Sequence, residues 1–312
     1  MITHLKLSFY KMVKVLVLGA SGFIGNAVAQ AFARAGHEIF GLVRKREKVK
    51  MLAMSEIFPI LGDVNDLASW MATAEQCDVI IDATSEYVEP VKLVNTILSS
   101  CNEISKKRVE AGGNKLLLIY TSSLWVYGGD PYSIKSEQTL IQTNLKLDFW
   151  RPECEQQILS SPHINAIIIR PGAVYGKSGS LTGIWFKAAI EGNLEGIGNR
   201  DVRWSFVHVD DLAESYVQAA ERAEIIKGQI FNITNNSTES MGDVLTAIAR
   251  VTKFKGEIKF REPTTDFEIA MAHTDLFTNR KSQTLLGWYQ KKLGFVDGIE
   301  IWWNSFKGWN DL

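Results

Sequence analysis

The sequence has few cysteines, almost no net charge and no long apolar run. Its 312 residues include 3 cysteines, Cys77, Cys101 and Cys154, without metal-ligand spacing, so we expect reduced thiols and no metal site. The net charge of −1 offers no broad attraction to nucleic acid or to an anionic membrane. No apolar run approaches the roughly 18 residues of a membrane span, and no signal peptide is recognisable. We therefore expect a cytoplasmic protein that recognises a small molecule locally.

The sequence does contain a regular alternation of apolar strands and helices. Residues 13–20, VKVLVLGA, are typical of a strand buried on both faces, and residues 21–36 carry apolar side chains at helical spacing. The alternation continues through strands at 37–44, 58–64, 77–84, 115–123 and 165–176 and helices at 65–76, 89–110 and 152–160. Strands that are apolar throughout, separated by helices, predict an α/β fold with a doubly wound parallel sheet.

A glycine-rich segment joins the first strand to the first helix. Glycines allow a tight turn, a close approach of backbone amides to a pyrophosphate and close packing of helix on strand. The helix N-terminus also attracts negative charge. A purely structural turn is the alternative, but the position between a buried strand and an amphipathic helix favours a Rossmann dinucleotide site. We expect cofactor contacts from Gly19, Ser21, Gly22, Phe23, Ile24 and Gly25.

The strict alternation weakens after residue 176. Helices are expected at 181–191, 210–223 and 240–252, with a strand at 228–234 and a Trp-rich end. We predict a dinucleotide-binding domain over residues 12–176, completed by segments within 203–235. A smaller C-terminal substrate-binding lobe is predicted over 177–312. Residues 1–11 are interpreted as an N-terminal extension, with Met12 as an alternative start.

The end of the second strand indicates which dinucleotide binds. An NAD site usually places an acidic residue there, whereas this strand ends in Arg44, Lys45 and Arg46, with no carboxylate before Glu47. Arg44 and Lys45 suit the 2′-phosphate of NADP(H), although a basic loop can also be merely solvated. NADP is therefore the expected cofactor, and NAD is the alternative.

Further cofactor contacts are expected after the third and fourth strands. Asp63, followed by Val64, can accept a hydrogen bond from an adenine amino group, cap the next helix, or do both. Ala83 and Thr84 follow the fourth strand, at the carboxyl edge where such sheets bind ligands.

Several motifs resemble one known family in their order along the chain. They are GASGFIG (19–25), GDV (62–64), YTSSLWVYG (120–128), RPGAVYG (170–176), FVHVDDLAESY (206–216), GQIFNIT (228–234) and LGWYQK (286–291). With them the sequence resembles the extended and atypical short-chain dehydrogenase/reductase family, also described as NAD-dependent epimerase/dehydratase-like. The resemblance implies that Ser123 hydrogen-bonds the reacting oxygen of the substrate, although it could instead cap a turn. It also implies that Pro171, Gly172 and Val174 pass close to the nicotinamide.

The family's catalytic pair, Tyr-x-x-x-Lys, is missing. If Glu155 matches the glutamate that many members carry four residues after the lysine, Arg151 takes the lysine position and Leu147 the tyrosine position. Arginine stays protonated and is a poor acid. We expect Arg151 either to contact cofactor or substrate or, together with Pro152, only to shape the start of a helix.

Two tyrosines are candidates to replace the missing proton donor. Tyr127 and Tyr175 both follow strands at the expected ligand edge, and Tyr127 is the preferred candidate. Both positions are also frequent packing residues in the family. Without a tyrosine, Ser123 and water would remain as the proton route.

The substrate lobe offers aromatic side chains more than charge. Arg203 lies one residue away from the position where nucleotide-sugar enzymes carry an arginine, which weakens a sugar-diphosphate assignment. Trp185, Phe186 and Trp204 suit the walls of a pocket for a flat or apolar substrate. His208 is interpreted as a core residue and Asp210 as a helix cap, without a metal.

Three functions are consistent with these residues. The leading hypothesis is an NADP(H)-dependent oxidoreductase acting on a carbonyl or conjugated double bond of a small organic substrate. A nucleotide-sugar epimerase or dehydratase is the second. A dinucleotide-binding regulatory protein without catalysis is the third. A homodimer through helices 89–110 and 152–160 is a further expectation.

Overall fold

A seven-stranded parallel sheet forms the centre of the protein. The computed structural model describes residues 12–86, 88–141 and 145–312, and the predicted extension at 1–11 lies outside them. The strand order is β10-β6-β5-β4-β1-β2-β3, with every neighbouring pair parallel. The strands are β1 Lys14–Leu18, β2 Glu38–Val43, β3 Phe58–Leu61, β4 Val79–Asp82, β5 Leu117–Thr121, β6 Asn165–Pro171 and β10 Gln229–Ile233. The predicted doubly wound α/β sheet is confirmed.

Helices cover both faces of the sheet, which explains why its strands are apolar throughout. One face packs against α1 Phe23–Arg34, α2 Val49–Ala53, α7 Val209–Glu221 and α8 Ala223–Ile226. The other packs against α3 Met71–Ala74, α4 Pro90–Glu110 and α5 Arg151–Ser160. Successive residues of a strand point to opposite faces. Accordingly, Val15 and Val17 of β1 enter the first core, and Leu16 and Leu18 enter the second.

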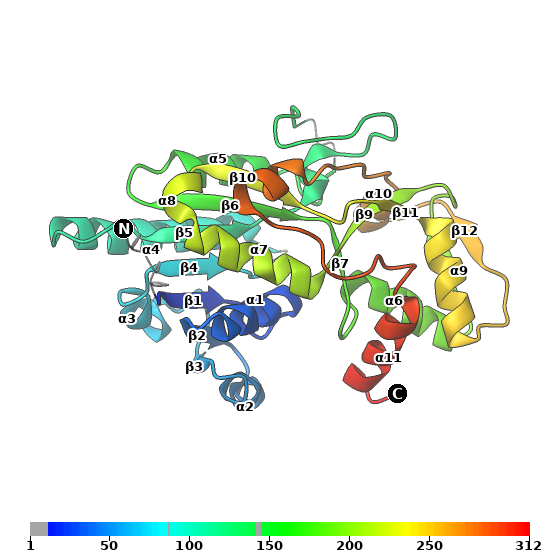
Figure 1. Ribbon diagram of the computed structural model, residues 1–312, viewed down its shortest axis with the longest axis horizontal. Coiled ribbons are helices and arrows are strands. Elements are labelled where there is room, and N and C mark those ends of the chain that lie inside the picture. Colours follow the sequence, from blue (N-terminus) through cyan, green and yellow to red (C-terminus); the bar gives the residue numbers. More distant parts are fainter. Residues whose placement is uncertain (1–11, 87, 142–144) are drawn as a thin grey trace, which may run out of the picture.

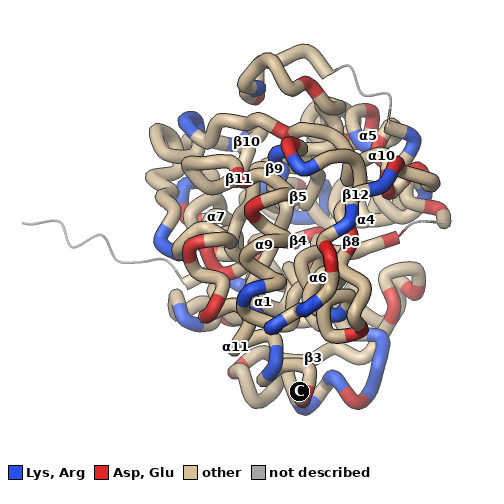
Figure 2. The backbone as a smooth tube through the Cα atoms, turned by 90° about the vertical axis from the view of Figure 1, so that its right-hand side faces the viewer, with Lys and Arg blue, Asp and Glu red and all other residues tan. Residues whose placement is uncertain are grey.

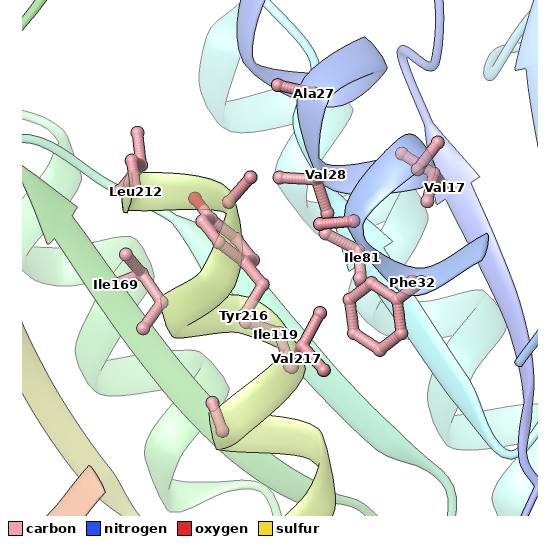
Figure 3. Packing of buried hydrophobic residues seen from close by; sticks show 14 of the residues in the cluster. Val17, Ala27, Val28, Phe32, Ile81, Ile119, Ile169, Leu212, Tyr216 and Val217 are labelled. Atoms are coloured by element: carbon pink, nitrogen blue, oxygen red, sulfur yellow. The ribbon is translucent and has the colours of Figure 1, made fainter. Parts of the chain in front are cut away.

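Helices α1 and α7 pack directly on each other over the middle of the sheet. Val28 and Phe32 of α1 face Tyr216 and Val217 of α7, above Ile119 of β5 (Figure 3). The Tyr216 hydroxyl lies 2.8 Å from Thr121 Oγ1 at the end of β5. This packing fixes the position of α1, whose first turn borders the ligand edge of the sheet.

The prediction of one continuous helix over residues 65–76 is wrong. The structure has a short 3-10 helix, η2 Leu67–Ser69, followed by α3 Met71–Ala74. Trp70 separates them with a backbone φ of −136°, outside the helical region. Its side chain is fully buried, and its indole N–H donates to the Val64 carbonyl at 3.1 Å. Burial of this indole therefore outweighs helical continuity.

A smaller lobe adjoins the carboxyl edge of the sheet and lies to the right in Figure 1. Its strands form two small sheets, β11-β9-β7 and β12-β8. The elements are β7 Ala173–Tyr175, α6 Ser180–Ile190, β8 Glu195–Ile197, β9 Arg203–His208, β11 Thr238–Ser240, α9 Met241–Thr252, β12 Lys259–Arg261, α10 Asp266–Met271 and α11 Ile299–Trp309. The remaining short helices are η1 Arg46–Lys48, η3 Leu124–Tyr127 and η4 Ser282–Leu286. Aromatic side chains dominate the lobe core, among them Trp185, Phe186, Phe206, Phe295 and Trp302.

The chain passes between the two parts several times. After β6 it enters the lobe at β7, and it returns with α7 to the central sheet. There β10 pairs with β6, with Ile230 opposite Ile168. After the lobe helices, η4 returns to the sheet, where Ser282 Oγ donates to the Asn232 carbonyl at 2.6 Å. The two parts are therefore tied together by several chain segments.

Within the described residues, no helix combines the length and the hydropathy that a bilayer span requires. On the side that Figure 2 presents, lysines and arginines alternate with aspartates and glutamates along the elements.

Candidate functional site

The turn between β1 and α1 admits only glycine at two positions. Gly19 has φ +81°, and a Cβ there would lie 2.6 Å from the Ala83 carbonyl oxygen. A Cβ on Gly25 would lie 2.3 Å from the carbonyl oxygen of Gly19. Helix α1 starts at Phe23, and its N-cap residue is Gly22, which has no side chain. No capping side chain therefore accepts hydrogen bonds from the first backbone amides of the helix. Such a helix start suits a phosphate group.

Two hollows meet at this turn and form one crevice along the carboxyl edge of the sheet. The smaller has a volume of about 190 Å³ and the larger about 550 Å³. Both are bordered by Gly22, Ala83, Thr84 and Ser85. The glycine turn therefore stands at the middle of the crevice, between its two halves.

The smaller hollow collects several of the residues expected at the adenosine half of a dinucleotide. Gly19, Ser21, Arg44, Asp63 and Val64 line it. The Asp63 carboxylate accepts hydrogen bonds from the backbone and side-chain nitrogens of the residue two positions later, at 2.8 and 3.1 Å. It thus closes a local turn, whereas the short helix η2 that follows has no side-chain cap.

Only the first of the expected phosphate-binding cations borders the hollow. Arg44 lines it and is exposed, whereas Lys45 and Arg46 are exposed outside it. The fit for a dinucleotide is therefore good at the glycine turn and at Arg44. Lys45 is not brought to the crevice.

The loop after β4 is held rigid beside the glycine turn. The Thr84 hydroxyl donates to Asp82 Oδ1 at 2.6 Å, and the Thr84 amide donates to the same oxygen at 3.0 Å. Burial raises the pKa of Asp82 above its ordinary value. The expected contact residues Ala83 and Thr84 therefore lie on a fixed wall between the two halves.

The larger hollow is lined by the two residues that stand in place of the family's Tyr-x-x-x-Lys pair. Leu147 and Arg151 both line it. Helix α5 begins at Arg151, with Pro152 in its first turn, and one turn later Glu155 forms a buried ion pair with Arg170 of β6. The alignment through Glu155 thus places two crevice residues at the tyrosine and lysine positions.

Arg151 is fixed as a cation on the wall of the larger hollow. Its Nε donates to Asp148 Oδ1 at 2.8 Å, its Nη1 donates to the Tyr120 hydroxyl at 3.3 Å, and its guanidinium stacks 4.5 Å from the Trp150 ring. Burial lowers the pKa of Arg151, but Tyr120 and Asp148 outweigh it, so the pKa is raised. Arg151 can hold an anionic or hydroxyl group but cannot serve as an acid.

Two buried polar atoms on this wall lack a hydrogen-bond partner among the described residues. They are Asp148 Oδ2 and Ser122 Oγ. Their residues are 3% and 5% exposed and line the larger hollow. A buried polar atom without a partner is costly, so these two atoms are places where a polar ligand group or a water can bind. Ser123 lines the same hollow, and its Oγ accepts from the Trp125 amide at 3.1 Å.

The two tyrosines considered as proton donors do not line either hollow. The Tyr127 hydroxyl donates to Asn232 Oδ1 at 3.1 Å and accepts from Arg170. The Tyr175 hydroxyl donates to the Leu293 carbonyl and accepts from Asn235 Nδ2. Burial raises the pKa of both phenols. Both hydroxyls are engaged in holding the fold together.

The aromatic wall of the larger hollow differs in part from the expected one. Trp204 lines the hollow as expected, and the Pro171–Val174 segment borders it. Trp185 and Phe186 instead lie in the lobe core, 2% and 1% exposed, where they pack against Trp204 and Phe306 respectively. The hollow is also lined by Phe267, Asp275 and Phe277, all from the segment 266–277, which the sequence did not predict. No motif or periodicity marks them.

The charges expected around the lobe have local structural partners. Arg203 is exposed and donates to the Thr238 side chain and carbonyl, outside the crevice. The prediction that Asp210 caps α7 is wrong. The helix starts at Val209, and its cap is His208, whose Nδ1 accepts a hydrogen bond from the Asp210 amide at 3.1 Å. Within the described part of the chain no group of three metal-ligating side chains is found.

Comparisons with known proteins agree with the fold. The model of the NAD dependent epimerase/dehydratase family matches residues 15–234. An uncharacterised protein of Saccharomyces cerevisiae is 26% identical over 306 residues, which cover 92% of this chain and 97% of that protein. UDP-glucuronate 4-epimerase 3 of Arabidopsis thaliana is 24% identical over 309 residues, which cover 84% of this chain and 70% of that protein.

A solved structure has the same architecture. The UDP-glucuronic acid 4-epimerase of Bacillus cereus, in complex with UDP-glucuronic acid and NAD, is similar with a TM-score of 0.76 at 20% sequence identity. The match covers 95% of this chain and 99% of that one. At this identity the likeness concerns the fold. Together with the family match, it confirms the resemblance seen in the sequence motifs.

Proposed function

We propose that this member of the NAD dependent epimerase/dehydratase family is an NADP(H)-dependent oxidoreductase. It would reduce a carbonyl or conjugated double bond of a small, flat organic compound. The observation that carries the proposal is the composition of the larger hollow. Trp125, Trp204, Phe267 and Phe277 contribute to its wall, and its cation is Arg151. Aromatic walls suit an apolar planar substrate better than a sugar diphosphate.

Different residues of the crevice would bind different parts of the dinucleotide. The amides at the glycine turn would hold the diphosphate, Arg44 the 2′-phosphate, and Arg151 the ribose next to the nicotinamide. When bound, the reduced dinucleotide supplies a hydride, which is one hydrogen with two electrons. Ser123 would donate a hydrogen bond to the reacting oxygen of the substrate, and the aromatic wall would exclude water.

The preference for NADP(H) depends on Arg44. Replacing Arg44 with serine is expected to weaken NADPH binding about 10- to 100-fold, because a charge-assisted hydrogen bond is worth about 1.5–3 kcal/mol. NADH binding should change less than about 2-fold. The matched control is Arg46→Ser, which removes an exposed cation that does not line the hollow. Calorimetric titration with both coenzymes measures the effect, and tighter binding of NADH by the unaltered protein would contradict it.

The proposed activity is tested by the consumption of NADPH. With 9,10-phenanthrenequinone, a flat aromatic diketone, and with oxygen excluded, we expect a loss of absorbance at about 340 nm. The product should be 9,10-dihydroxyphenanthrene, one equivalent for each NADPH oxidised. Bound dinucleotide without turnover of this or other carbonyl compounds would contradict the reductase and leave the epimerase and the regulatory protein as candidates.

A nucleotide-sugar epimerase is the second candidate. The family match and the similarity to a UDP-glucuronate 4-epimerase over most of the chain support it more directly than they support the reductase. Against it stands Arg203, which is bonded to Thr238 outside the crevice. An epimerase regenerates its dinucleotide in each turnover and should retain it through purification. Incubation with UDP-glucuronate and analysis of the sugar by NMR distinguishes the two functions, since only an epimerase gives UDP-galacturonate without net NADPH loss.

A further inference from the structure

The wall of the larger hollow contains an acid that none of the motifs identifies. Asp275 is 6% exposed and lies in the segment after α10, on the side of the lobe. Its backbone is fixed at both ends: its amide donates to the Arg203 carbonyl at 2.8 Å, and its carbonyl accepts from Ser205 Oγ at 2.8 Å. The position of this carboxyl group is therefore set by β9, the strand that it lies against.

One tryptophan connects Asp275 to the expected substrate-binding serine. The Trp125 indole N–H donates to Asp275 Oδ2 at 3.2 Å, and the Trp125 backbone amide donates to Ser123 Oγ at 3.1 Å. All three residues line the same hollow. Ser123 and the Asp275 carboxyl group are therefore linked through one tryptophan on the wall of this hollow.

The phenols and the other carboxylate in or near the hollow are each bonded to another group, although Asp148 Oδ2 itself has no partner among the described residues. The hydroxyls of Tyr127 and Tyr175 bond to buried partners outside it, and the position of the family's tyrosine carries Leu147. Asp148 holds the guanidinium of Arg151 at 2.8 Å. Among the described residues that line the hollow, Asp275 is therefore the acid whose hydrogen-bond partner is a neutral indole.

Resting on the function proposed above, we propose that Asp275 is the proton donor of the reaction and replaces the family's tyrosine. In the reduction, the O–H bond of the Asp275 carboxyl group breaks and a new O–H bond forms on the substrate oxygen. The substrate carbon gains the hydride from the reduced dinucleotide, so a carbonyl becomes an alcohol. Solvent then returns one proton to Asp275, which balances the step.

The surroundings of Asp275 favour its protonated form near neutral pH. The charged or titratable groups around it are Lys135, Asp130 and His273 on adjoining loops, Arg203 on β9, and Asp148 and Arg151 on the wall of the hollow. Burial raises the pKa of Asp275 to about 7, while Lys135 and the bond from Trp125 oppose the rise. The Lys135 ammonium donates to the Gly128 carbonyl at 2.9 Å. An acid with a pKa near the working pH is suited to proton transfer.

The first test replaces Asp275 with asparagine, which keeps the acceptor for Trp125 and removes the proton. With NADPH and 9,10-phenanthrenequinone we expect kcat to fall by a factor on the order of 10²–10⁴, while the NADPH dissociation constant stays within about 2-fold. Burial raises the pKa of Asp275 to about 7, and the acid must be protonated to act. Above this pH, kcat of the unaltered protein should therefore fall about tenfold per pH unit. The variant should lack this pH dependence.

The second test observes the carboxyl group without cofactor or substrate. In the full chain labelled with [γ-¹³C]aspartate, one carboxyl signal should titrate near pH 7 and be absent from Asp275→Asn. The matched control is Glu239→Gln. Burial also raises the pKa of Glu239 to about 7, but this residue lines a different hollow. The control should keep both kcat and the aspartate signal.

The outcomes separate this inference from the proposed function. If Asp275→Asn keeps kcat within about 3-fold, or if its signal titrates below about pH 5, near the ordinary range of aspartate, Asp275 is not the donor, while the reductase function stands. If the unaltered protein binds NADPH but turns over no carbonyl compound, both are overturned. A uniform loss of NADPH binding in the variant would also contradict the inference, because it would show a structural role.

Discussion

Replacement of Gly22 by aspartate is expected to weaken dinucleotide binding by a factor on the order of 10²–10³. Gly22 is the N-cap of α1 and borders both halves of the crevice, so a carboxylate there stands where the diphosphate is proposed to bind. Two unit charges about 4 Å apart near a protein surface repel by about 4 kcal/mol, and 1.4 kcal/mol corresponds to a factor of ten. Calorimetric titration with NADPH measures the loss.

The fold itself should tolerate this change. Gly22 has φ −75° and ψ 170°, a conformation open to any residue, and an added Cβ would lie 3.2 Å from the Gly19 carbonyl oxygen. Aspartate is also a favoured N-cap residue. Gly308→Asp is the matched control, since it adds the same charge on α11 where a Cβ meets nothing within 4 Å. If Gly22→Asp bound NADPH within about 3-fold of the unaltered protein, the proposed diphosphate site would be wrong.

Replacement of Glu155 by glutamine should lower the free energy of unfolding by about 3–5 kcal/mol, which is the usual effect of breaking a buried ion pair. Arg170 and Glu155 are each 2% exposed, with Arg170 Nε donating to Glu155 Oε1 at 2.9 Å and a second bond between Nη2 and Oε2. Without the carboxylate, the guanidinium remains buried with the Tyr127 hydroxyl as its other polar partner. Urea denaturation followed by circular dichroism measures the change.

The double variant Glu155→Gln/Arg170→Met provides the control for this prediction. It removes the buried cation together with its partner, and apolar replacement of a whole ion pair is often close to neutral. We therefore expect it to recover most of the stability lost in the single variant. A single variant that loses less than about 1 kcal/mol would show that the pair does not secure α5 against β6.

The sequence predicted the central sheet well because burial on both faces leaves a clear pattern. Residues 13–20 lack polar side chains apart from Lys14, and the structure places β1 there between its two neighbours. The glycine turn was equally readable, since Gly19 and Gly25 meet backbone atoms that no side chain could accommodate. The family resemblance, aligned through Glu155, put Leu147 and Arg151 at the tyrosine and lysine positions, and both residues line the larger hollow.

Contacts between distant segments could not be read in the same way. Asp275 meets Trp125 across 150 positions of sequence, and neither residue belongs to a periodic pattern that would reveal the pairing. Trp185 and Phe186 are aromatic residues in an apolar helix, and only the packing of the lobe decides that they point inward. Side-chain direction in the smaller lobe depends on tertiary contacts, which local propensity does not specify.

The late arrival of β10 in the sheet affects how the protein is made. Strand β6 pairs on one side with β5 and on the other with Gln229–Ile233, so the ribosome must extend the chain through the intervening lobe segments before that second side is covered. At about 5–20 residues added per second, a nascent chain carries an unpaired apolar strand edge for several seconds. Exposed edges of this kind pair readily with other strands, so we expect chaperones that cover this edge during synthesis to raise the yield of folded protein.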